Sequence, residues 1–91
     1  MENESLAGVR QSWEKNQTIL MEIPVVIMDF LKLFVILKSQ RDGKYKLNRY
    51  FRIGNAWQVS VDLETDDVNE IYREIQEDKD LKYLKDLLQT K

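Results

Sequence analysis

Apolar and polar side chains alternate along the middle of this 91-residue chain in the manner of antiparallel strands. Two dipeptides typical of tight hairpin turns, Asp42-Gly43 and Gly54-Asn55, enclose one alternating stretch. A second alternating stretch runs from Trp57 to Glu64. Because period two places alternate side chains on opposite faces of a sheet, the pattern predicts a three-stranded antiparallel meander over about residues 33–64.

The segment before this meander is apolar almost throughout. The strand that enters the first turn, about Leu33–Ser39, is apolar on both faces, so we expect both of its faces to be covered. Residues 19–32 fit either element type. The run Val25-Val26-Ile27 favours a strand, whereas Pro24 in the first position of a helix favours a helix.

Helical spacing marks the two ends of the chain. Leu6, Val9 and Trp13 recur every three or four positions, which predicts a helix over residues 4–17 with Asn3 or Ser5 as its N-cap. Near the C-terminus, Thr65 or Asp66 can cap a helix with an apolar stripe of Val68, Ile71, Tyr72 and Ile75.

A break near residues 77–79 is expected to separate that helix from a second one. Asp78 or Asp80 can cap the second helix, whose apolar face holds Leu81, Leu84, Leu87 and Leu88. We therefore predict an α+β fold with an N-terminal helix, a three-stranded antiparallel meander, and one or two C-terminal helices packed on the sheet. At this length, residues 1–91 are expected to form one compact domain.

The apolar segment raises the question of a membrane span. Residues 19–37 hold fifteen apolar residues out of nineteen. Asp29 and Lys32 lie near the centre, however, and each costs ~2.5–3.5 kcal/mol on insertion, which cancels most of the apolar gain. We interpret the segment as part of a buried core. The acidic start of the chain lacks the features of a signal peptide, so we expect the cytoplasm, of the cell itself or of a host.

Composition excludes several chemistries. The chain has no Cys and no His, which removes disulfides, thiol catalysis and the commonest general base and metal ligand. The acids Asp62, Glu64, Asp66 and Asp67 do not fit a calcium-binding loop, because Asp67 stands where that loop needs glycine and Arg73 where it needs glutamate. We therefore expect no catalytic activity, no metal and no cofactor.

Charge is distributed unevenly although the net charge is only −2. Residues 38–61 carry six basic residues against one acid, whereas residues 62–91 carry five basic residues against ten acids. A basic middle can bind an acidic partner, pair with the acidic C-terminal third, or simply be solvated.

The basic strand is the one candidate binding feature. If its apolar side chains point inward, a cationic and aromatic row faces outward, joined by a lysine of the neighbouring strand. This row consists of Lys38, Lys44, Lys46, Asn48, Tyr50 and Arg52. Such a face suits an acidic protein surface, and it equally suits phosphates and unstacked bases. Arg49 falls on the inward row, so it must lie at a rim or pair with an acid.

These features predict a small non-catalytic protein that binds another protein as a regulator, adaptor or inhibitor. Compact acidic chains without catalytic motifs often act by occupying a partner's surface, as small phage inhibitors and regulatory subunits do. The alternative is a nucleic-acid-binding protein that uses residues 38–52. We also expect a homodimer, because the apolar surface exceeds what one small core encloses; Phe34 and Ile36 are the predicted interface residues.

Overall fold

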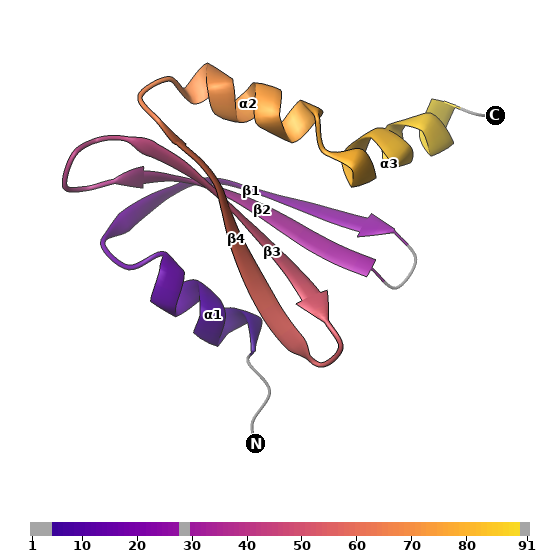
Figure 1. Ribbon diagram of the computed structural model, residues 1–91, viewed down its shortest axis with the longest axis horizontal. Helices are drawn as coiled ribbons and strands as arrows, with labels where there is room; N and C mark the ends of the chain where they lie inside the picture. Colours follow the sequence, from indigo (N-terminus) through magenta and orange to yellow (C-terminus); the bar gives the residue numbers. More distant parts are fainter. Residues whose placement is uncertain (1–4, 28–29, 90–91) are drawn as a thin grey trace.

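The computed structural model describes residues 5–27 and 30–89 and confirms the α+β fold (Figure 1). Four antiparallel strands form one sheet in the order β1-β2-β3-β4, with α1 on one face and α2 and α3 on the other. The elements are α1 (Leu6–Trp13), β1 (Gln17–Ile27), β2 (Phe30–Ser39), β3 (Tyr45–Ile53), β4 (Ala56–Thr65), α2 (Val68–Gln76) and α3 (Lys79–Gln89).

The fourth strand comes from the segment whose secondary structure the sequence left open. Residues 17–27 form β1 and pair along β2, so the predicted count of three strands was too low by one. Pro24 is compatible with this strand because β1 lies at the edge of the sheet, where a missing N–H need not break a ladder hydrogen bond. The β-branched run that follows Pro24 fits a pleated surface.

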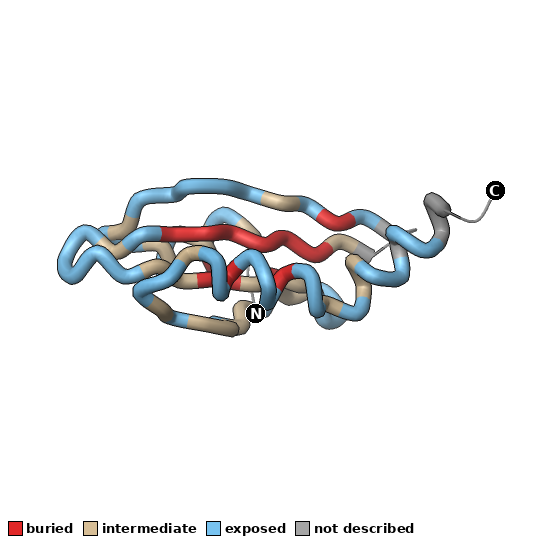
Figure 2. The backbone as a smooth tube through the Cα atoms, turned by 90° about the horizontal axis from the view of Figure 1, so that it is seen from above, coloured by how far each residue is buried: buried red, intermediate tan, exposed pale blue. Residues whose placement is uncertain are grey.

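Both faces of the sheet are buried, as expected from the doubly apolar strand β2. On the α2 side, Phe34, Ile36 and Leu47 pack with Ile71 and Ile75 of α2. On the α1 side, a separate core of residues forms beneath the short helix, and it consists of Val9, Leu33, Val35, Leu37 and Tyr50. Buried positions therefore occupy the interior of the molecule between exposed outer segments (Figure 2).

A β-bulge divides the alternation of β4. Leu47 pairs with Leu63, but the next residue, Asn48, pairs with Val61, so Asp62 is the extra residue on β4. Leu63 consequently packs on the α2 side, whereas Trp57 and Val59 pack on the α1 side. The alternating apolar set of this strand thus does not share one face, contrary to the sequence interpretation.

The turns and caps follow the predictions only in part. Gly54-Asn55 forms the expected two-residue connection, with Gly54 at φ +63°. The other connection has five residues, 40–44, and Gly43 at φ +74° lies within it. Ser5 caps α1, but this helix ends at Trp13 rather than near residue 17.

The C-terminal helices separate near the predicted break. Asp67, and neither Thr65 nor Asp66, caps α2 by accepting a hydrogen bond from the Asn69 N–H. Asp78 accepts from the backbone N–H groups at the start of α3, as one of the two predicted caps. The side chains of Leu84, Leu87 and Leu88, which were expected on the apolar face of α3, lie outside the described part of the structure.

Candidate binding surface

The connection from α1 to β1 and the loop from β2 to β3 lie at the same end of the sheet (Figure 1). Four basic residues come together there. The connection from α1 to β1 contributes Lys15, and the loop from β2 to β3 contributes Arg41 and Lys44. Lys46, near the start of β3, completes the group, which we call the basic loop end. These side chains line a pocket of about 240 Å³ together with the acids Asp42 and Glu64.

The cations of the basic loop end are not neutralised within the described part of the chain. None of the four forms an ion pair there, although Arg10, Lys32, Arg49 and Lys82 all do. Asp42 accepts a hydrogen bond from the Lys44 N–H at 3.0 Å, and this bond is the main reason that the pKa of Asp42 is lowered; the charge of the Lys44 side chain adds to the effect. The basic loop end therefore presents an excess of positive charge, with four cations against two acids.

Strand β1 leaves this end of the sheet and presents apolar side chains. Ile19, Leu20 and Met21 are 45%, 46% and 44% exposed, and we call these three residues the apolar edge. A bulge at Leu20 interrupts the pairing with β2 between Ile19 and Met21. Among the described strands β1 pairs with β2 alone, so its other side is an open sheet edge.

The predicted cationic row on β3 is wrong for its two central members. Asn48 and Tyr50 are both 0% exposed, because α1 covers the face that the sequence assigned to solvent. Lys38 lies on the opposite face of the sheet, with its ammonium group 5.6 Å from the ring centre of Tyr45. The exposed Arg52 lies near the far end of β3, so the structure brings only Lys44 and Lys46 of the predicted row into one group.

Asn48 and Tyr50 belong to a buried polar network instead. The Tyr50 hydroxyl donates to Glu14 at 2.7 Å and accepts from the Asn48 amide at 3.2 Å. Glu14 in turn forms an ion pair with Arg10 at 2.7 Å. Burial is the largest influence on Tyr50 and raises the pKa of its hydroxyl well above the usual range, while the hydrogen bond from Asn48 opposes this shift and that to Glu14 adds to it. The network fastens α1 to the sheet.

The predicted dimer interface is also buried within the chain. Phe34 and Ile36 are each 1% exposed and pack beneath α2. These two residues were predicted to contact a second copy, but the N-terminal helix covers one face of this strand and α2 covers the other. Neither side chain is accessible to a second copy.

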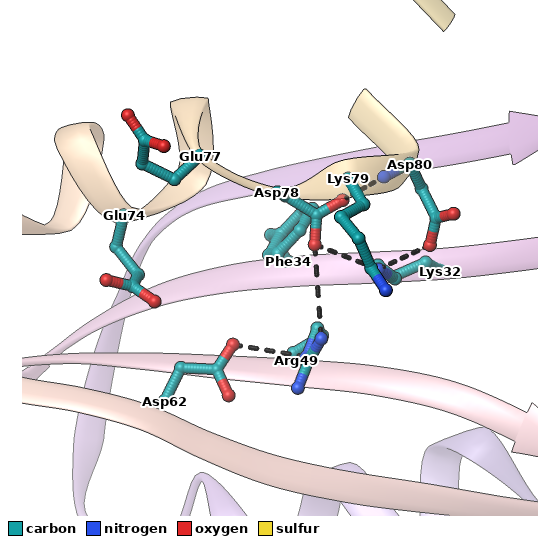
Figure 3. A pocket seen from close by; sticks show the side chains of 9 residues that line it. All are labelled: Lys32, Phe34, Arg49, Asp62, Glu74, Glu77, Asp78, Lys79 and Asp80. Atoms are coloured by element: carbon teal, nitrogen blue, oxygen red, sulfur yellow. Dashed lines mark hydrogen bonds and ion pairs between the residues drawn. The ribbon is translucent and has the colours of Figure 1, made fainter. Parts of the chain in front are cut away.

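A second pocket contains a buried cluster of opposite charges (Figure 3). Lys32 of β2 reaches Asp78, in the segment that joins α2 to α3, at 2.9 Å and Asp80, in the first turn of α3, at 2.6 Å. Arg49 of β3 pairs with Asp62 at 3.1 Å and lies 3.9 Å from Asp78, which confirms that this inward-facing arginine pairs with an acid. The pocket has a volume of about 260 Å³. We call these five residues the charged clasp.

The clasp is organised around one buried ion pair. The side chains of Lys32 and Asp78 are only 6% and 8% exposed. Burial acts to raise the pKa of Asp78, but the hydrogen bond from Lys32 and those from the backbone of Leu81 and Asp80 outweigh burial, so its pKa lies below the ordinary value. Each carboxylate of the clasp faces a cation, which indicates that the clasp holds the junction of α2 and α3 against the sheet.

The partners of Lys32 and Arg49 in this clasp were not predicted from the sequence. Lys32 interrupts an apolar run, and a buried cation requires an acid, so a partner could have been expected. Which acid would be the partner of Lys32 could not be predicted, because Asp78 lies 46 residues further along the chain. The basic loop end was not predicted for a similar reason. Lys15 comes close to Arg41 and Lys44 only because β1 pairs with β2.

The acids considered for metal binding are separated by the fold. Asp62 pairs with Arg49, whereas Asp67 caps α2. Within the described residues, no three His, Cys, Asp or Glu side chains are grouped as metal ligands would be. No helix in that part of the chain has the length and apolar character needed to cross a bilayer.

Comparison with protein-family models, with curated proteins and with solved structures finds no match to this chain.

Proposed function

We propose that this protein is a non-catalytic binding protein of the cytoplasm that takes up an extended segment of another protein along the open edge of β1. The observation that supports this proposal best is the apolar edge, where Ile19, Leu20 and Met21 are each nearly half exposed on a strand with one free side. An added strand gains main-chain hydrogen bonds from such an edge, and the exposed side chains contribute apolar contact.

Pro24 limits how much of the edge an incoming strand can use. Proline has no N–H to donate, and proteins place it on edge strands to prevent indiscriminate pairing. The stretch available before Pro24 is therefore the first part of β1, from Gln17 to Ile23, which contains the whole apolar edge and the bulge at Leu20. Because only this part of β1 can pair with an incoming strand, the edge favours binding of one short segment of a partner over indiscriminate aggregation.

A second copy of the chain suits the edge less well than a different protein does. Two β1 strands paired with each other would bring Glu22 to the interface, and Glu22 already forms an ion pair with Arg10 at 3.0 Å. In a symmetric antiparallel pair over Gln17–Ile23, Glu22 of the copy would lie opposite Thr18 beside the basic loop end, but its carboxylate is already engaged by Arg10. A partner with its own acidic residues would match both features.

The proposal can be tested with a library of displayed twelve-residue random peptides, selected on the purified protein. We expect enrichment of peptides with alternating apolar residues. Met21→Lys should abolish their binding, whereas Val61→Lys should not, because Val61 is equally exposed, at 42%, but lies on β4 at the opposite edge. Both substitutions are at surface positions and should change stability by no more than about 0.5 kcal/mol.

Three results would contradict the proposal. One is the absence of any enrichment, and another is binding that survives Met21→Lys. The third is a dimer in sedimentation at micromolar concentration that Met21→Lys dissociates, since a second copy would then be the occupant. Binding to random single-stranded or duplex nucleic acid, with a steep loss as salt rises, would favour the nucleic-acid alternative.

A further inference from the structure

We infer that the segment bound along β1 runs antiparallel to it and carries acidic residues directly after its apolar part, so that they enter the pocket of the basic loop end. This inference rests on the proposed function and adds the direction and the charge of the ligand. It follows from the position of the basic loop end relative to the first residues of β1.

The basic loop end and the apolar edge are continuous. Gln17 lines the basic pocket and is also the first residue of β1, and the apolar edge begins only two residues later at Ile19. Lys15, which lines the same pocket, lies two residues before the strand. A strand paired with the first part of β1 therefore ends beside the pocket.

The direction of the ligand follows from the sheet. All three existing strand pairs are antiparallel, and antiparallel pairing is slightly more stable per residue than parallel pairing. A strand added antiparallel to β1 has its C-terminal end at Gln17. The ligand pairs along Gln17–Ile23 on both sides of the bulge at Leu20, and the two to four residues that follow in the ligand are those that reach the basic pocket.

The chemistry of the pocket specifies acids at this place. Four cations that form no ion pair among the described residues line it. The pocket also holds two acids, Asp42 beside Lys44 and Glu64 opposite Lys46. Lys15 and Gln17 border the pocket next to β1, whereas Glu64 enters from β4, which is the far strand of the sheet. A carboxylate approaching from the β1 side therefore meets the cations first.

The test uses three peptide sub-libraries that share one randomised eight-residue core. The first carries three aspartates after the core, the second carries three aspartates before it, and the third carries three asparagines after it. We expect the first set to dominate selection at low salt, with binding on the order of ten-fold tighter than the asparagine set, because several exposed charge pairs act together. This advantage should shrink as ionic strength rises.

Substitutions in the basic pocket test whether it causes the tighter binding of peptides with aspartates after the core. Arg41→Glu and Lys44→Glu should each remove most of the advantage of the first set while leaving the asparagine set unaffected. Arg52→Glu is the matched control, since it makes the same charge change on an exposed residue of β3, six residues from Lys46, which is roughly 20 Å along the strand.

The remaining outcomes separate the two proposals. Equal enrichment of the first and third sets would overturn this inference but retain the proposed function. Dominance of the second set would show that the direction is wrong, and an advantage that survives Lys44→Glu and Arg41→Glu would show that the pocket is wrong. Failure of all three sets would overturn the proposed function together with the inference.

Discussion

The substitution Asp78→Asn tests whether the buried ion pair of the charged clasp holds the C-terminal helices on the sheet. Asparagine keeps an oxygen that can accept from the N–H groups of Asp80 and Leu81, at 2.9 and 3.1 Å in the native cap. Since Asn and Asp are similar N-caps, the capping contribution should change little. The change therefore removes mainly the negative charge that faces Lys32.

The magnitude follows from the burial of the pair. Removing one partner of a buried ion pair costs about 3–5 kcal/mol, because the other charge stays buried without compensation. Asp80, at 2.6 Å from the Lys32 ammonium, remains as a partner but is 39% exposed. We therefore expect a loss of about 2–4 kcal/mol in the free energy of unfolding, with a fall in Tm of about 10–20 °C.

The assay is denaturation by urea followed by circular dichroism at pH 7. Glu77→Gln is the matched control, because Glu77 pairs with Lys82 at the surface, where the side chains are 75% and 55% exposed. Exposed pairs contribute only ~0.2–1 kcal/mol. The double variant Lys32→Met with Asp78→Asn should be more stable than the sum of the two single losses implies, with a coupling of at least about 1 kcal/mol.

The pH dependence gives an independent check. The pKa of Asp78 is lower in the folded protein than its unfolded value of about 3.9, so the unfolded chain binds the proton first as the pH falls. The contribution of the charge is complete above about pH 4 and is lost as the pH falls through the folded pKa. The stability gap between the native protein and Asp78→Asn should therefore close below about pH 4. A single-variant loss under about 0.5 kcal/mol, or a gap that persists at low pH, would refute the reasoning.

Three further predictions concern other parts of the fold. Tyr50→Phe should cost about 1–3 kcal/mol in urea denaturation, because it leaves buried Asn48 and Glu14 without the hydroxyl; an unchanged midpoint would argue against the network. Because the pKa of Tyr50 is raised by burial, its ionisation should be missing from the absorbance titration near pH 10, and stability should fall from about pH 10 upward. Gly54→Ala should lower the free energy of unfolding by about 1 kcal/mol, because Gly54 has φ +63° and an added Cβ would meet no neighbouring atom, so the cost is backbone strain. Gly54→Asn should lower it by less, and equal losses for the two variants would contradict this explanation.

Periodicity predicted the elements of this fold better than it predicted their surroundings. The alternation on β3 correctly separated Leu47 from Asn48, and the doubly apolar β2 correctly indicated cover on both faces. The error was to treat the polar set of β3 as facing solvent. A helix covering that set cannot be recognised from β3 itself, since the hydroxyl of Tyr50 and the amide N–H of Asn48 find their acceptors, Glu14 and the Trp13 carbonyl, at the C-terminal end of α1.

Two further features depended on contacts between distant parts of the chain. The bulge at Asp62 shifts one residue in β4, and nothing in the local alternation of Val59, Val61 and Leu63 reveals it. The apolar edge became recognisable only when residues 17–27 proved to be an edge strand, because the same residues in a helix or a central strand would be covered. The candidate binding surface is thus a product of strand order.

Amide hydrogen exchange is the most direct test of the claim that β1 is the binding edge. The measurement compares the free protein with the protein saturated by a peptide selected from the acidic-tail library. We expect slower exchange in the first part of β1, residues 18–23, while β4 at the opposite edge keeps its rates. Protection along β4, or no protection along β1 while the peptide is bound, would contradict the account.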